Sequence, residues 1–303
     1  MKTASDTAAR RDLYQDITTR IVADLERGVR PWMKPWSATH VSGPLLPLRH
    51  NGTPYRGVNV LLLWGAGMAG GYTATTWMTF RQALELGGHV RKGERGSLVV
   101  YADRITKTEE GSNGEDIERS IPFLKSYTVF NVEQMEDLPP QYRAPAPAPV
   151  LPEFRHAKAE QFIAATRATI RFGGNRAFYS PAMDFIQLPP PPSFRDMESF
   201  FGTALHELTH WSGAPSRCAR DLCTRFGSQA YAFEELIAEL GATFLCAELG
   251  VTPEVREDHV AYLASWLAVL KQDKRAIFTA ASQAQRAADY LRNLLPKQDE
   301  AAA

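Results

Sequence analysis

The spacing of hydrophobic positions predicts an amphipathic helix over residues 10–27. Its apolar side chains recur three or four positions apart, and they are Leu13, Ile17, Ile21, Val22 and Leu25. Two further helices are expected over residues 55–69, which are almost wholly apolar, and over 79–87. In the last of these, Thr79 is placed to cap the first turn and Gly87 to end the helix.

Two runs rich in β-branched and aromatic residues, 97–105 and 121–131, flank the acidic segment 109–115. Such runs on either side of a polar, glycine-containing turn are typical of a β-hairpin. Together with the helices before it, the hairpin predicts a mixed α/β N-terminal domain.

The pattern becomes mainly helical in the second half of the chain. A helix is expected over residues 156–170, and a short hairpin is expected from 176–179 and 185–188. The four helical segments that follow are 193–211, 228–249, 254–271 and 273–294. This half is therefore expected to be a helical domain with a small β-sheet, and the whole chain an α+β protein.

A segment rich in proline and alanine, residues 138–153, separates the two halves. Closely spaced prolines cannot continue a helix and favour an extended connector. We expect an N-terminal domain over 1–137, a linker over 138–153 and a C-terminal domain over 154–303, which suits a chain of 303 residues.

The charges balance overall but are unevenly distributed. Lys and Arg together number 34, as do Asp and Glu, which excludes a uniformly basic nucleic-acid coat. Residues 1–102 hold 13 basic against 7 acidic side chains, whereas residues 144–303 hold 16 against 18. A basic surface is therefore expected in the first third of the chain.

The chain has the features of a cytoplasmic protein with no membrane partner. It has three cysteines, an odd number that does not suggest a disulfide framework. Its first residues lack the apolar stretch of a secretory signal, and its longest apolar run, 58–69, is too short to cross a bilayer.

The most specific motif is His206-Glu207-Leu208-Thr209-His210. On a helix, His206 and His210 lie one turn apart on one face and can bind the same metal ion. Glu207 lies beside them and can take a proton from a metal-bound water. The alternative, two histidines on a solvated face, fits poorly with the apolar residues Phe200, Phe201 and Leu205 before the motif.

A second helix, 231–240, resembles the second metal-binding helix of the gluzincin metallopeptidases, the thermolysin-like group. That resemblance implies Glu235 as the third ligand and Glu239, one turn later, as the carboxylate that holds a ligand histidine. Glu234 is a competing ligand, although it points about 100° away on a helix. Three protein ligands leave a position for water, as in catalytic sites.

The predicted chemistry is metal-dependent peptide hydrolysis with Glu207 as general base. Tyr179 and Tyr231 are candidate donors to the developing oxyanion, although each can equally be a packed core tyrosine. The two histidines and one glutamate favour Zn²⁺. Mn²⁺, Co²⁺ and Ni²⁺ bind the same donor types, so the sequence leaves them open.

Several motifs follow one another along the chain. In the N-terminal half they are Pro31-Trp32, Pro35-Trp36, Tyr55-Arg56-Gly57-Val58-Asn59, Trp77-Met78-Thr79-Phe80-Arg81-Gln82 and Gly88-His89-Val90-Arg91-Lys92-Gly93-Glu94. In the C-terminal half they are Phe178-Tyr179-Ser180-Pro181 with Asp184, the histidine motif with Trp211 and Gly213, and the segment 231–239. In this order the motifs resemble the ArdC antirestriction proteins of conjugative plasmids, whose relatives also form N-terminal parts of plasmid primases.

The resemblance implies a single-stranded DNA-binding N-terminal domain, a zincin-like metallopeptidase domain, and protection of incoming plasmid DNA from host restriction. Single-strand binding needs basic side chains for phosphates and aromatic faces for bases. The candidate DNA-binding residues are Lys34, Trp36, Tyr55, Arg56, Asn59, Trp77, Arg81, Gln82, Arg91, Lys92 and Arg95. For any one aromatic residue, core packing is the simpler explanation.

Two functions remain open. One is a DNA-binding antirestriction protein whose peptidase site acts on a host protein, such as a restriction enzyme, or in which coating of the DNA alone protects it. The other is a stand-alone zinc metallopeptidase whose N-terminal domain recognises a protein substrate and has no DNA role.

Overall fold

The computed structural model describes residues 12–32, 46–110, 116–142, 152–222, 227–251 and 259–296. The N-terminal elements are α1 (Leu13–Glu26), β1 (Leu48–Arg49), α2 (Val58–Gly70), β2 (Thr76–Met78), α3 (Phe80–Glu85) and β3 (His89–Val90). The three helices expected from the sequence here are confirmed. Thr79 caps α3, and Gly28, with φ of +75°, follows the end of α1.

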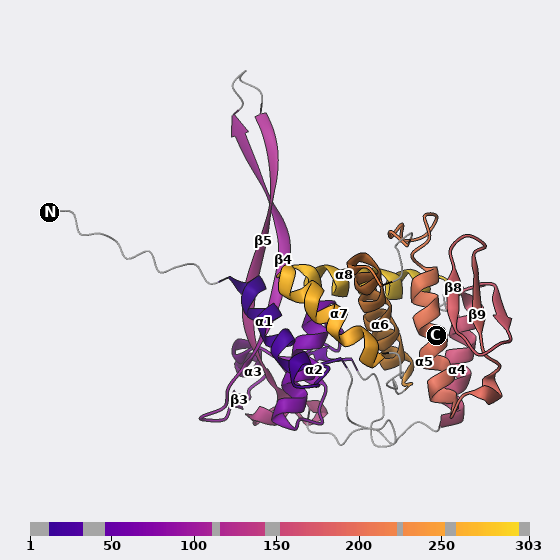
Figure 1. Cartoon of the computed structure of the whole chain (residues 1–303). Coiled ribbons are helices and arrows are strands. Elements are labelled where there is room, and N and C mark those ends of the chain that lie inside the picture. Colours follow the sequence, from indigo (N-terminus) through magenta and orange to yellow (C-terminus); the bar gives the residue numbers. More distant parts are fainter. Residues whose placement is uncertain are drawn as a thin grey trace.

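The expected hairpin is present, and its two strands extend beyond the residues that the sequence pattern predicted. Strands β4 (Ser97–Glu110) and β5 (Asp116–Asn131) pair antiparallel along their whole length and project from the body as a two-stranded arm (Figure 1). The base of the arm joins a sheet with the strand order β1-β2-β5-β4. A short strand, β6 (Met135–Glu136), pairs with β3.

The C-terminal half contains α4 (Pro152–Ala165), β7 (Ile170–Phe172), β8 (Phe178–Ser180), β9 (Phe185–Leu188), α5 (Met197–Trp211), α6 (Gln229–Leu249), α7 (His259–Gln272) and α8 (Ala276–Arg292). The expected hairpin forms as β8 and β9, and β7 adds a parallel third strand in the order β7-β9-β8. The expected helical arrangement with a small sheet is confirmed.

Several expected helix boundaries differ by a few residues, and two of these differences have a clear physical cause. The first helix of this half ends at Ala165, before Arg167 takes a positive φ of 56°, and Ile170 lies in a strand instead. The next helix begins at Met197, because Pro189–Pro192 lack the amide protons a helix needs and Asp196 caps the first turn by accepting from the Ser199 amide at 2.8 Å.

One hydrophobic core joins the two predicted domains. It combines buried side chains of α1, α2 and the base of the arm with those of α6, α7 and α8. Figure 1 shows α6, α7 and α8 between the N-terminal elements and the group formed by α4, α5, β8 and β9. A second core packs α4 and α5 against α6 and the small sheet. Helix α6 therefore contributes to both cores.

The predicted linker begins with ordered residues. Leu138 is buried, and the Tyr142 hydroxyl donates to the backbone carbonyl of His50 at 2.7 Å, so the chain stays attached to the N-terminal part up to residue 142. Residues 143–151 lie outside the described residues. The domain boundaries therefore stay a prediction. Within the described residues, none of the helices has the length and apolarity needed to cross a bilayer.

Candidate metal centre

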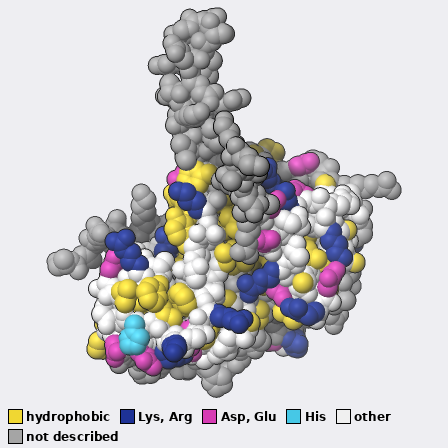
Figure 2. All heavy atoms as spheres, turned by 90° about the vertical axis from the view of Figure 1, so that its left-hand side faces the viewer, with side chains coloured by type: hydrophobic (Ala, Val, Ile, Leu, Met, Phe, Trp, Pro, Cys, Tyr) yellow, Lys and Arg dark blue, Asp and Glu magenta, His cyan; other side chains and the backbone are white. Residues whose placement is uncertain are grey.

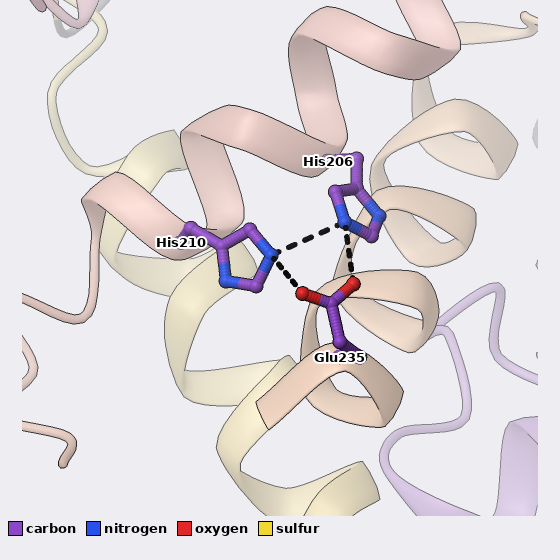
Figure 3. A group of neighbouring side chains, drawn as sticks. All are labelled: His206, His210 and Glu235. Atoms are coloured by element: carbon purple, nitrogen blue, oxygen red, sulfur yellow. Dashed lines mark hydrogen bonds and ion pairs between the residues drawn. The ribbon is translucent and has the colours of Figure 1, made fainter. Parts of the chain in front are cut away.

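Helices α5 and α6 bring together the three residues predicted as metal ligands. His206 and His210 lie one turn apart on α5, and their side chains point toward Glu235 on α6 (Figure 3). The Nε2 atoms of the two histidines are 3.2 Å apart, and each lies 3.5 Å from a different carboxylate oxygen of Glu235. One donor atom from each residue therefore faces a common point.

These separations suit one metal ion held between the three side chains. An ion with nitrogen and oxygen ligands at about 2.0–2.1 Å in tetrahedral geometry has neighbouring donor atoms roughly 3.3–3.4 Å apart. All three side chains are largely buried, with 6% of His206, 13% of His210 and 10% of Glu235 exposed. The donor set and its spacing thus fit a divalent metal ion.

A glycine allows the two helices to approach closely beside this cluster. Gly241 on α6 packs against Thr209 on α5, and a Cβ atom at position 241 would lie 2.5 Å from the Thr209 methyl carbon. Any other residue there would require Thr209 or the helix backbone to shift. The close crossing brings the α6 carboxylates within reach of the α5 histidines.

Glu234 contacts the other nitrogen of His210. Its carboxylate lies 3.1 Å from Nδ1 of His210 and also accepts from the guanidinium of Arg220, at 2.9 and 3.0 Å. The Arg220 side chain is 4% exposed and also bonds Thr209 and Ser212 of α5. This contact was not anticipated, because the sequence offered Glu234 only as a rival ligand and offered no signal for Arg220.

The charges in the cluster stabilise one another. Burial disfavours charge on His210, but its hydrogen bonds with Glu234 and Glu235 outweigh burial and raise the pKa of the imidazole above its usual range. Burial likewise favours a neutral Glu235, yet the two histidines hold the pKa of this carboxyl well below its usual range. The carboxylate is therefore ready to bind a cation.

Glu207 and Glu239 are both buried near the donor residues, at 3% and 3% exposed. Glu207 follows His206 directly on α5, and Glu239 lies one turn beyond Glu235 on α6. Their predicted roles, general base and partner of a ligand histidine, stay predictions. The carboxylate that contacts Nδ1 of His210 is Glu234.

The two candidate oxyanion donors differ in their surroundings. The Tyr231 hydroxyl lies 3.2 Å from that of Tyr262; burial raises the pKa of Tyr231, and hydrogen bonds with Tyr262 and Glu235 add to this. The Tyr179 hydroxyl donates to Asp184 at 2.8 Å, and burial together with this bond raises its pKa to about 12. Both tyrosines are neutral at physiological pH, but only Tyr231 contacts the predicted ligands.

Four of the candidate DNA-binding residues instead stabilise the N-terminal fold. Trp77 and Tyr55 are only 2% and 8% exposed, so their rings offer little surface on which bases could stack. The Asn59 amide bonds both the carbonyl and the amide of Val100 on the edge strand β4. Gln82 completes the capping box of α3.

The basic candidates lie at the surface. Arg56 pairs with Asp289, Arg81 with Glu85 at 2.9 Å and Arg91 with Glu94 at 2.6 Å. Lys92 and Arg95 are exposed in the turn that leads into β4. Lys34 and Trp36 lie outside the described residues.

Both halves of the chain match families of known proteins. Residues 11–130 match the N-terminal domain of the anti-restriction factor ArdC, and residues 157–283 match a zincin-like metallopeptidase domain. The metal-free crystal structure of the antirestriction protein ArdC from plasmid R388 is 46% identical, with a TM-score of 0.79 over 94% of this chain and 98% of that one. The chain belongs to the ArdC antirestriction family.

A further structure and two further proteins are similar to most of this ArdC-family chain. An Mn(II)-bound structure of the R388 protein is 44% identical, with a TM-score of 0.76 over 95% of this chain and all of that one. The uncharacterised protein y4eC of Sinorhizobium fredii is 42% identical over 288 residues, 92% of this chain and 91% of y4eC. The DNA primase TraC of Escherichia coli is 37% identical over 298 residues, which are 93% of this chain and 27% of TraC.

Proposed function

We propose that this ArdC-family protein binds single-stranded DNA, protects incoming conjugative DNA from host restriction, and carries a metal-dependent peptidase site. The observation that carries the enzymatic part is the cluster of His206, His210 and Glu235, whose donor atoms lie 3.2 to 3.5 Å apart. Incoming DNA is found in the cytoplasm, so we expect the protein to act there.

His206, His210 and Glu235 would hold the metal ion. Once bound, a divalent ion supplies Lewis acidity that polarises a peptide carbonyl and makes water more acidic. Two imidazoles and a carboxylate favour Zn²⁺, and the Mn(II)-bound structure of the R388 relative keeps Mn²⁺ among the candidates, together with Co²⁺ and Ni²⁺.

The other residues of the cluster move or hold protons. Glu207 accepts a proton from the attacking water and returns it to the leaving amine. Glu234 would accept a hydrogen bond from Nδ1–H of His210, which leaves Nε2 of that ring to bind the metal ion. Tyr231, which a raised pKa keeps protonated, is the better placed of the two tyrosines to donate to an oxyanion.

The DNA-binding part rests on the N-terminal half. It matches the ArdC N-terminal domain over residues 11–130, and an excess of basic residues is confined to the first 102 positions. The similarity to a primase also supports a role on DNA. A host protein, such as a restriction enzyme, is the substrate we propose for the peptidase site.

Glu207→Gln separates these activities. We expect the variant to keep about one metal ion per chain by elemental analysis and to bind a labelled single-stranded oligonucleotide as the wild type does. Its protection of DNA transferred into a restricting recipient should be lost. Glu248→Gln, in which an α6 carboxylate paired with Arg292 is neutralised, is the matched control.

Three other results would point elsewhere. Full protection by Glu207→Gln would mean that DNA coating alone protects. If the wild type fails to bind single-stranded DNA at moderate salt, the chain is a stand-alone metallopeptidase whose N-terminal half recognises protein. Absence of metal from the wild type would overturn the enzymatic part.

A further inference from the structure

The base of the β4–β5 arm presents aromatic side chains to solvent. Tyr101 on β4 and Tyr127 on β5 are 49% and 48% exposed. Two-stranded arms can be stabilised by cross-strand side-chain pairs alone, but such pairs do not require rings that are half open to water. The exposed rings therefore suggest a ligand.

The register of the arm puts these rings on one face. Val99 pairs with Tyr127, Tyr101 with Lys125, and Asp103 with Phe123, and directly paired residues share a face in an antiparallel ladder. On this face Val99 is buried, whereas Tyr101 and Tyr127 are exposed to solvent. Hydrophobic and basic side chains are visible directly below the arm in Figure 2.

The rings of Tyr101 and Phe123 lie next to each other and to a cation. The ring centres of Tyr101 and Phe123 are 6.2 Å apart, and the Lys125 ammonium lies 5.0 Å from the centre of the Phe123 ring. The exposed Arg95 lies two residues before the start of β4. Aromatic faces next to positive charge are what single-stranded nucleic acid requires, because unpaired bases stack on the rings and phosphates bind the cations.

We propose that Tyr101 and Tyr127 are a stacking platform for the bases of single-stranded DNA, with Lys125 binding the adjacent phosphate. The inference rests on the DNA-binding part of the proposed function, and it names the surface on which the DNA would bind. Lys125 beside the rings suits a phosphate backbone, and the acidic Asp103 of the same face accepts a hydrogen bond from the Tyr101 hydroxyl at 2.6 Å.

The test measures the binding of a fluorescently labelled, mixed-sequence oligonucleotide of about 20 nucleotides to the full chain, at several salt concentrations. Tyr101→Thr and Tyr127→Thr remove the ring but keep a residue that favours strands. Each should weaken binding about 5- to 150-fold, the range for loss of one base stack, and leave the salt dependence unchanged. Lys125→Gln should lower the salt slope by about 0.7.

Two controls distinguish stacking from damage to the arm. Tyr127→Phe keeps the ring and should bind as the wild type does. Phe172→Thr removes a ring that is 56% exposed on β7, in the other half of the molecule, and should have no effect.

Wild-type affinity in both threonine variants would overturn this inference, while the DNA-binding proposal would stand. Equal loss of affinity in Tyr127→Phe would also overturn it, because stacking does not need the hydroxyl. A wild type that binds no single-stranded DNA would overturn both proposals together.

Discussion

The carboxylate of Glu234 lies 3.1 Å from Nδ1 of His210, while the next residue, Glu235, lies 3.5 Å from Nε2 of the same ring. Two consecutive glutamates of α6 thus contact the two nitrogens of one imidazole. Arg220 closes the arrangement from the other side of Glu234. The carboxylate at Nδ1 holds the ring in one orientation and, when Nε2 binds a metal, favours the tautomer whose proton is on Nδ1.

Glu234→Gln is therefore expected to weaken metal binding without abolishing it. Loss of the carboxylate removes the charge that orients His210 and leaves Arg220 without its ion pair. We expect metal affinity to fall by about 10- to 100-fold, as is typical when the partner of a ligand histidine is lost. Competition with a chelating dye measures this on the full chain.

Two further variants make that result specific. Glu248→Gln, on the same helix, should bind metal as the wild type does, because Glu248 pairs with Arg292 instead. Glu235→Gln should lose metal binding almost entirely. Equal and complete loss in Glu234→Gln would instead make Glu234 a ligand, and unchanged affinity would leave it without a role in the site.

Gly241→Ala is expected to disturb the same site through the packing of α6 against α5. The added methyl group would lie 2.5 Å from the Thr209 side chain, so Thr209 or the helix backbone must shift. Overpacking of this kind costs about 1–3 kcal/mol, and a shift of α6 would also separate Glu235 from the histidines. Urea unfolding and the chelator competition should both report the change.

Gly202→Ala is the matched control, because Gly202 lies on α5 with open space where its Cβ would be. An alanine there should be neutral or stabilise the protein by about 0.5–1 kcal/mol, as alanine favours the helix. Metal affinity that survives in Gly241→Ala would show that the close helix crossing is not needed for the site.

A local motif and one resemblance were enough to predict that His206, His210 and Glu235 lie together. His206 and His210 belong to a five-residue motif, and helical spacing alone puts them on one face. Glu235 followed from likeness to a known second helix. Once two amphipathic helices cross, three donors on facing surfaces have little freedom, so the sequence could predict their grouping.

Contacts that depend on tertiary packing could not be predicted in this way. Arg220 reaches Glu234 from a loop after α5, and no periodicity marks such a contact. Trp77 and Asn59 carried the residue types expected for DNA binding, yet one is buried and the other bonds the backbone of Val100. Residue type did not distinguish a surface position from a core one.

The ion pair between Asp184 and Arg217 predicts a pH effect on stability. The hydrogen bond from Arg217 outweighs the effect of burial and holds the pKa of the Asp184 carboxyl below its usual range. The stabilisation is therefore fully present above the pKa of an unfolded aspartate, about 3.9, and is lost as pH falls through the lower folded pKa.

Asp184→Asn should accordingly be less stable than the wild type at pH 7 and lose less stability on acidification. Because the Asp184 side chain is 54% exposed, solvent screens the pair, and we expect a difference of only about 0.5 kcal/mol that shrinks at high salt. Urea unfolding of both proteins at pH 7 and pH 3.5 measures it. A gap that widens at low pH would contradict the assignment.

The shared core predicts that both halves of the chain unfold together. The Trp64 ring of α2 packs against the Phe244 ring of α6, with centroids 6.1 Å apart and both residues buried. Phe244→Ala should cost about 3–5 kcal/mol, as for other large buried rings. Because α6 joins both cores, the loss should lower the hydrogen-exchange protection of α2 and of α5 to a similar extent. If α2 alone is destabilised while α5 keeps its protection, the two halves are independent domains that merely touch.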